Sequence, residues 1–200
     1  MSALETDATA PRSETLRLAA RLNPTLHEPA VVMVCGVDRD DGVAALAVEL
    51  GRSFALMRGG SVLAADCRFG SAAEPAFGAA AGRPGIRERL TGARQLSEIE
   101  TADSVAGLAL IGTGSAHQAP SPLLGPDAVT LTDELRSRYR VAFLAVDPLF
   151  ASPTALRLAR AVDGVILAIK AGEDRGDRIQ TAVSLLEQMG AKLLGGVLVE

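Results

Sequence analysis

The feature that most constrains the fold of this chain is an alternation of apolar, strand-like runs with helix-like segments from residue 30 onward. The strand-like runs span residues 30–35, 61–65, 106–111, 141–146, 164–169 and 192–199, and the helix-like segments span 43–57, 85–91, 128–138, 152–162 and 177–189. Strands joined by helices pair in parallel through crossover connections. The pattern therefore predicts an α/β fold, a mainly parallel central sheet with helices on both faces.

The composition is that of one globular domain, because the chain has 200 residues, of which 48% are hydrophobic and 22% charged. We expect residues 30–200 to form this domain. Residues 1–29 are expected to form an N-terminal tail and a short helix over 13–22, with Ser13 as the candidate N-cap.

The charge and apolar patterns exclude two kinds of partner. The net charge is −4 and no basic tract is present, which argues against nucleic acid and against an anionic membrane surface. No apolar run approaches the roughly 20 residues of a membrane span, and the N-terminus has no apolar segment of the kind found in secretory signals. We therefore expect a cytoplasmic protein with no membrane span of its own.

Two residue types that often carry chemistry are sparse. Cys35 and Cys67 each follow an apolar run and are expected to be small buried residues; they would form a redox pair only if the fold brought them together. His27 and His117 lie in loop-like segments without metal-ligand spacing, so we expect them to be exposed and predict no metal site.

The segment VCGVDRDDGVAAL, residues 34–46, has the layout of a phosphate-binding loop: a strand, a glycine-bounded turn and a helix. Where such a loop carries Gly-Lys-Ser/Thr, this one has Gly42-Val43-Ala44. Its three acids, Asp38, Asp40 and Asp41, would repel phosphate; they form either a solvated acidic turn or a divalent-ion site, and we favour the turn. We expect Gly36 and Gly42 to serve the backbone turn.

In open parallel sheets, ligands bind beyond the carboxyl ends of the strands. Three such ends are therefore of interest, at residues 35–42, 66–70 and 146–149. Asp66 and Asp147 are the carboxylates at the second and third. We expect Asp66 to cap the turn that follows it, and Asp147, which precedes Pro148, to form a turn.

Six segments in order carry a family resemblance. They are VLAADCRFGSAAEPAFG (62–78), GIRERLTGARQLSEI (85–99), APSPLL (119–124), RYRVAFLAVDP (138–148), ALRLARAVDGVILAIKAGEDR (155–175) and LLEQMGAKLLGGVL (185–198). The chain resembles, over about residues 13–200, the cytoplasmic kinase domain of bacterial tyrosine kinases from capsule and exopolysaccharide export. These are deviant-Walker P-loop ATPases, which implies a P-loop NTPase-like fold.

Residue by residue, the resemblance implies a degenerate nucleotide site. The family's phosphate-loop lysine and Mg²⁺-binding Ser/Thr fall on Val43 and Ala44, and its Walker B aspartate falls on Ala145. Asp40 stands where the family has a glycine, Arg68 where it has the second Walker A′ aspartate, and Val199 where it has the adenine-reading Asn. Asp66 retains the first Walker A′ aspartate. A contact at about 4 Å between a loop carboxylate and a phosphate would cost on the order of 4 kcal/mol at an effective dielectric constant near 20. We therefore expect no ATP or Mg²⁺ cofactor and no catalytic residue.

The resemblance implies a non-catalytic pseudokinase that acts as a scaffold or regulator of exopolysaccharide biosynthesis and export. One alternative is an active ATPase or tyrosine kinase that uses ATP and Mg²⁺ with Asp66, Asp147 and Arg39 or Arg68. Another is a partitioning-type dimerisation switch, which the Pro-Ser-x-Leu-Leu and Leu-Thr-Gly segments disfavour. Family kinases usually carry a C-terminal tyrosine cluster, whereas this sequence has one tyrosine, Tyr139.

The helix over residues 13–22 places Glu14, Arg17 and Arg21 on one face. A Glu-x-x-Arg-x-x-Arg helix mediates ring assembly in the family, but here Ala20 holds the second arginine position, so an ordinary solvated face is an equal alternative. The resemblance also implies a homo-oligomer that docks on the cytoplasmic tail of a membrane polysaccharide co-polymerase. The protein would then lie at the inner membrane through that partner.

Overall fold

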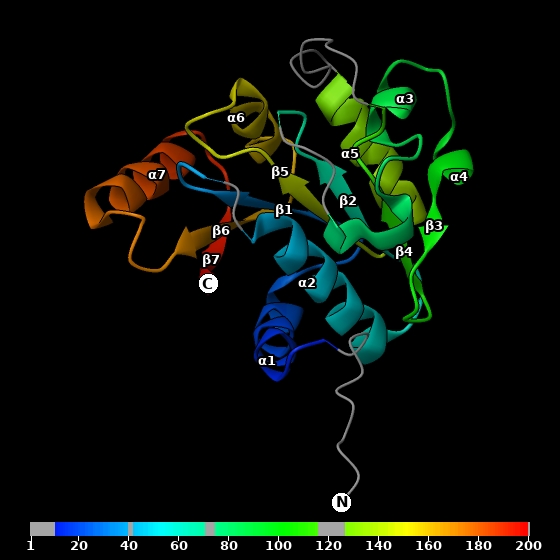
Figure 1. The fold of residues 1–200 in the computed structure, drawn as a ribbon. Helices are drawn as coiled ribbons and strands as arrows, with labels where there is room; N and C mark the ends of the chain where they lie inside the picture. Colours follow the sequence, from blue (N-terminus) through cyan, green and yellow to red (C-terminus); the bar gives the residue numbers. More distant parts are fainter. Residues whose placement is uncertain (1–10, 40–41, 71–74, 116–126, 200) are drawn as a thin grey trace, which may run out of the picture.

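The computed structural model describes residues 11–39, 42–70, 75–115 and 127–199, which form a seven-stranded sheet with helices on both faces (Figure 1). The strands are β1 (Ala30–Gly36), β2 (Val62–Cys67), β3 (Thr101–Ala102), β4 (Leu108–Ile111), β5 (Val141–Val146), β6 (Gly164–Lys170) and β7 (Leu193–Val199). Their order across the sheet is β3-β4-β2-β5-β1-β6-β7. All neighbouring pairs are parallel except β3 with β4, so the predicted mainly parallel α/β fold is confirmed.

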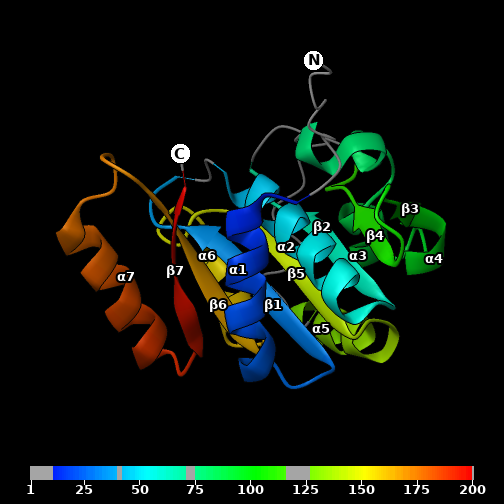
Figure 2. The ribbon, with the colours of Figure 1, turned by 90° about the horizontal axis from the view of Figure 1, so that it is seen from below.

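The helices divide between the two faces of the sheet (Figure 2). They are α1 (Ser13–Leu22), α2 (Val43–Arg58), α3 (Ile86–Leu90), α4 (Leu96–Ile99), α5 (Asp127–Arg138), α6 (Pro153–Ala159) and α7 (Gly176–Gln188), with 3₁₀ segments η1 (Asn23–Thr25) and η2 (Pro75–Ala80). The buried side chains of α1, α2 and η2 form one core cluster with the sheet. Those of α3 to α7 form the other.

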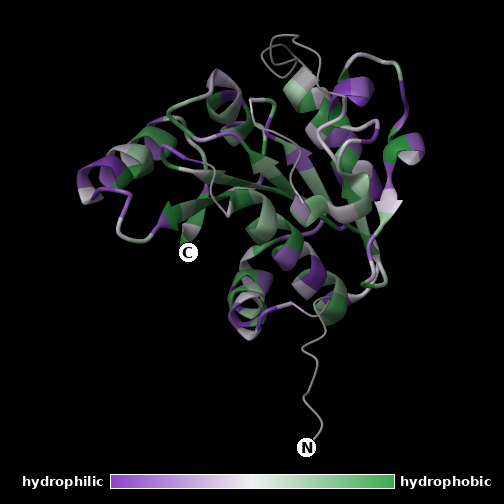
Figure 3. Ribbon diagram, in the orientation of Figure 1, coloured by the Kyte–Doolittle hydropathy of each residue, from purple (hydrophilic) through white to green (hydrophobic). Residues whose placement is uncertain are grey.

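Strand β1 shows why the sheet is central. All seven of its residues are buried, and alternate side chains enter opposite cores: Val31 and Met33 face α5 to α7, whereas Val32 and Val34 face α1 and α2. The central strands are largely green in the hydropathy colouring, while α1 and α7 carry purple segments (Figure 3). The unbroken apolar runs in the sequence thus correspond to strands covered on both sides.

Several expected boundaries are wrong for local reasons. Ser13 is the first residue of α1, not its N-cap; Arg12 holds the cap position, without a side-chain cap, and its N–H donates to the Glu49 carboxylate at 2.8 Å. The run expected to begin a strand at residue 106 begins one at Leu108, because Gly107 turns with a φ of 90°. The helix expected over 152–162 ends at Ala159. Strand β3 and helix α4 were not expected.

The segment 119–124 and His117 lie outside the described residues. Within the described ranges, no helix combines the length and the apolar character that crossing a membrane requires.

Candidate functional site

The turn between β1 and α2 has the layout of a phosphate-binding loop. Gly42 occupies the N-cap position of α2 with a φ of 73°, a left-handed conformation that favours glycine, as expected for this turn. Gly36 does not share that role, because it is the last residue of β1, and its carbonyl accepts the Leu149 N–H at 2.9 Å. Asp40 and Asp41 lie outside the described residues.

The residues at the phosphate and metal positions are apolar and turned into the core. Val43 and Ala44 are 0% and 2% exposed, and both pack in the cluster beneath α2. Ala145 is buried in the centre of β5. Val199 reaches the loop from β7, since a Cβ atom added at Gly42 would lie 3.2 Å from the Val199 Cβ. The surfaces on which a triphosphate, a metal and adenine would depend are therefore hydrocarbon.

Asp66 is paired with Arg68, two residues further along the chain. The guanidinium forks onto the carboxylate, with Nε to Oδ1 and Nη2 to Oδ2 both at 2.9 Å, and the Arg68 N–H donates to Oδ1 at 3.1 Å. The expected cap of the turn is thus present, and the residue at the second Walker A′ position supplies the counter-charge. Both residues are buried, at 1% and 2% exposure.

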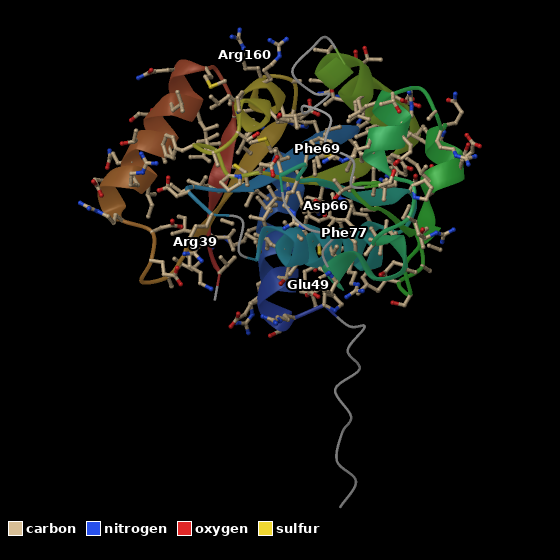
Figure 4. The ribbon with its side chains drawn as sticks, turned by 45° about the horizontal axis from the view of Figure 1, so that its top comes forward. Arg39, Glu49, Asp66, Phe69, Phe77 and Arg160 are labelled. Carbon is tan, nitrogen blue, oxygen red and sulfur yellow. The ribbon has the colours of Figure 1, made fainter. Side chains whose placement is uncertain are left out.

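Asp147 lies at the adjacent strand end and also serves the turn after β2. Its two carboxylate oxygens accept the N–H groups of Phe69 at 3.1 Å and Gly70 at 3.2 Å. Arg87 of α3 completes this turn, because its Nη2 donates to the Phe69 carbonyl at 2.7 Å and its guanidinium carbon lies 4.9 Å from the centre of the Phe69 ring. Asp66 and Phe69 mark the turn in Figure 4.

Asp38 and Arg39 are held by ion pairs with distant segments. Asp38 accepts Nε of Arg178 on α7 at 2.9 Å, and this hydrogen bond lowers the pKa of Asp38. The Arg178 guanidinium carbon also lies 4.0 Å from the centre of the Phe150 ring. The Arg39 side chain is 58% exposed and pairs with Glu173 at 3.2 Å (Figure 4).

The two thiols are unreactive in this fold. Cys35 and Cys67 are free and fully buried. Burial raises the pKa of Cys35 to about 12. Burial, with the nearby charges of Asp66 and Asp147, raises the pKa of Cys67 well above 9.0. His27 is exposed, and the described residues contain no group of three or more His, Cys, Asp or Glu residues arranged to hold a metal ion.

The residues present do not fit a nucleotide with its Mg²⁺. Triphosphate needs converging N–H donors and positive charge, but Arg39 and Arg178 already pair with acids, and Val43 replaces the lysine. Of the described acids at these strand ends, Asp66 is committed to Arg68, and each oxygen of Asp147 accepts a backbone N–H. Among the described residues, the charged side chains Asp38, Asp66 and Asp147 are thus each engaged by other groups of the chain.

Two further predicted features lie away from the loop. Glu14, Arg17 and Arg21 are all exposed on α1, opposite the buried Thr15 and Leu22. Tyr139 is buried, and its hydroxyl donates to the Glu100 carboxylate at 2.7 Å; burial, together with this hydrogen bond, raises the pKa of Tyr139.

Arg178 and Phe150 were not foreseen, because residue 178 is 140 positions from its partner and no local pattern connects them. The Asp66–Arg68 pair had a local signal, an acid and an arginine two residues apart at a strand end.

A parallel-rich sheet with a glycine-capped loop between its central β1 and α2 defines the P-loop NTPase-like class of α/β proteins. No family model matches the chain. Among solved structures of this class, the septum site-determining protein MinD of Pyrococcus horikoshii, complexed with Mg-ADP, aligns with a TM-score of 0.63 at 16% identity over 84% of this chain and 69% of that chain. At that identity the likeness concerns the fold alone.

Tyrosine kinase domains are more similar. The VpsO kinase domain is 28% identical over 93% of this chain and 90% of that chain, with a TM-score of 0.79. The kinase domain of the Escherichia coli tyrosine kinase ETK is 20% identical over 98% and 83%, with a TM-score of 0.81. The putative tyrosine-protein kinase EpsB of Ralstonia solanacearum is 35% identical over 89 residues, which are 44% of this chain and 12% of that protein. The chain is thus similar in fold and sequence to bacterial tyrosine kinase domains, and it spans 12% of the length of EpsB.

Proposed function

We propose that the protein is a non-catalytic pseudokinase that acts as a scaffold or regulator in bacterial exopolysaccharide biosynthesis and export. One observation carries the proposal: the positions expected to contact phosphate and metal hold Val43, Ala44 and Ala145, each at most 2% exposed. A phosphoryl-transfer site depends on positive charge and a bound metal to stabilise its transition state. These side chains can supply neither.

The acids of the region support the same reading. Asp66 would have to release Arg68 before it could contact a metal or a nucleophile, and each oxygen of Asp147 already accepts one backbone N–H. Such a rearrangement would leave buried polar groups unpaired, which is costly. The alternative of an active kinase built on these residues therefore lacks support.

A non-catalytic scaffold acts through the surfaces with which it binds other proteins. We propose that the chain docks on the cytoplasmic tail of a membrane polysaccharide co-polymerase, and is thus cytoplasmic and peripheral at the inner membrane, and that it self-associates. A ligand that does not bind cannot shift a conformational equilibrium. The amount of tail captured in a pull-down should therefore be the same with and without ATP.

Isothermal titration calorimetry with ATP and Mg²⁺ tests the central proposal, with the ETK kinase domain as a parallel sample. We expect no heat of binding from this chain at micromolar ATP. In a separate assay with labelled ATP, we expect no incorporation of labelled phosphate into the protein. Micromolar ATP binding in the presence of Mg²⁺ would overturn the pseudokinase assignment.

A further inference from the structure

The carboxyl ends of β2 and β5 bring two buried acids and one buried arginine together. In the parallel register of these strands, Cys67 is opposite Val146, so Arg68 and Asp147 are the next residues of adjacent chains. Asp66, Arg68 and Asp147 are exposed by 1%, 2% and 6%. Adjacent strands lie about 4.8 Å apart, which places the guanidinium at a strand edge that carries both carboxylates.

We propose that Arg68 is the resident cation of this strand edge: its guanidinium takes the place that a divalent ion would occupy between Asp66 and Asp147 and excludes that ion. This deepens the proposed function, on which it rests, by naming what replaced the metal.

Two buried carboxylates at adjacent strand ends require a positive charge. Like charges on neighbouring strand ends repel each other more strongly inside a protein than in water, because the effective dielectric constant there is lower. Arg68 meets this requirement with a planar, bidentate contact to Asp66, the strongest geometry for a guanidinium and a carboxylate. Mg²⁺ or Ca²⁺ would meet it in a different way, by direct coordination to carboxylate oxygens.

The contacts of the acids leave little capacity for a metal while Arg68 is in place. A carboxylate has roughly four lone-pair sites. Asp66 accepts three hydrogen bonds, all from Arg68, through Nε, Nη2 and the backbone N–H. Each oxygen of Asp147 accepts a backbone N–H. Removal of the guanidinium would free the two side-chain acceptor sites of Asp66 without disturbing the turn that Asp147 holds.

The test is thermal unfolding of the full chain in millimolar Mg²⁺, Mn²⁺ or Ca²⁺, compared with NaCl at equal ionic strength. The wild type should be insensitive to the divalent ions. Arg68→Met should lower Tm by about 10 °C, because it leaves buried acids unpaired. Divalent ions at about tenfold excess over Kd should then raise the Tm of this variant by roughly 3–6 °C.

Arg52→Met is the matched control. Arg52 forks onto the largely buried Asp103 with almost the same geometry, 3.1 Å from Nε and 2.9 Å from Nη2, but away from the carboxyl ends of β2 and β5. Its Tm should fall without recovery in divalent ions. Arg68→Lys keeps the positive charge and should remain insensitive to them. If Arg68→Met does not fold in NaCl, recovery of its far-ultraviolet circular dichroism on addition of Mg²⁺ or Mn²⁺ is the readout.

The proposal is overturned if Arg68→Met shows no response to any of the three ions, or if Arg52→Met responds equally. Those outcomes differ from failure of the proposed function, which would appear as ATP binding by the wild type. A response of Arg68→Met together with a wild type that ignores divalent ions supports the assignment of Arg68 as the cation.

Discussion

At the scale of single residues, the proposed loss of nucleotide chemistry rests on two independent observations. Apolar side chains stand at the positions of the lysine, the hydroxyl and the Walker B acid, and these side chains are integral to the core. The remaining acids are separately engaged, Asp66 with Arg68 and Asp38 with Arg178. Restoring the family residue at one of these positions would therefore not restore phosphate and metal binding at the others.

The double substitution Val43→Lys with Ala44→Ser should not restore ATP hydrolysis. Ala145 and Val199 would still leave metal and adenine unsupported, and a lysine at the fully buried position 43 faces the positive end of the α2 dipole. An unpaired buried charge costs about 3–5 kcal/mol, so we also expect a lower Tm. Val43→Met with Ala44→Ser is the uncharged control; measurable turnover by the lysine variant alone would show that only the loop was missing.

The buried thiols predict a loss of stability at alkaline pH. Burial raises the pKa of Cys35 from 9.0 to about 12, so the folded state holds its proton more tightly than the unfolded state does. The stabilisation is therefore complete below pH 9 and declines as the pH rises from 9 toward 12. Tm measured from neutral pH upward should fall less steeply in a Cys35→Ala/Cys67→Ala variant. Equal slopes for the two proteins would contradict the prediction.

At the scale of elements, β7 and α7 contact the residues that flank the β1–α2 turn. Val199 at the end of β7 lies against Gly42, and Arg178 near the start of α7 pairs with Asp38. The last residues before the undescribed positions 40–41 and the start of α2 are thus contacted by side chains from the last two elements of the described chain.

Gly42→Ala should destabilise the start of α2. A non-glycine residue at a φ of 73° is strained, which costs about 1–3 kcal/mol, and its Cβ would lie 3.2 Å from that of Val199. We expect Tm to fall by roughly 3–10 °C, with partial recovery when Val199→Ala is added. Gly176→Ala is the control, because Gly176 begins α7 with no neighbour within 4 Å and no positive φ. Equal effects of the two alanines would refute the assignment of strain to Gly42.

Element length decides what local sequence pattern can predict. Runs such as residues 141–146 are buried on both faces and unbroken, so their length and flanking turns identify a strand. β3 has two residues and α4 has four, too few to show any period. The cap at Arg12 depends on Glu49 of another helix, which no pattern within residues 11–16 contains.

At the scale of the whole molecule, the alternation of six strand-like runs with helix-like segments predicts the mainly parallel sheet apart from β3, because crossover topology follows from alternation. The apolar residues at the phosphate positions were also visible in the sequence. The ion pairs that complete the candidate site were not, since Asp38 and Arg178 meet only after β6 and α7 have packed against β1. The sequence alone therefore does not show which charged side chains pair with each other in the folded protein.

Self-association is the prediction that belongs to the whole molecule. Glu14, Arg17 and Arg21 are exposed on α1, and charged contacts between such residues in different copies would weaken with salt. Light scattering of the wild type at high protein concentration should therefore show oligomers that dissociate as salt is raised, and Arg17→Glu/Arg21→Glu should be monomeric at low salt. Arg83→Glu/Arg160→Glu changes charge equally at exposed positions on other segments and should associate like the wild type. A wild type that is strictly monomeric, and that captures no co-polymerase tail in a pull-down, would end the scaffold proposal, because neither surface on which it depends would then bind.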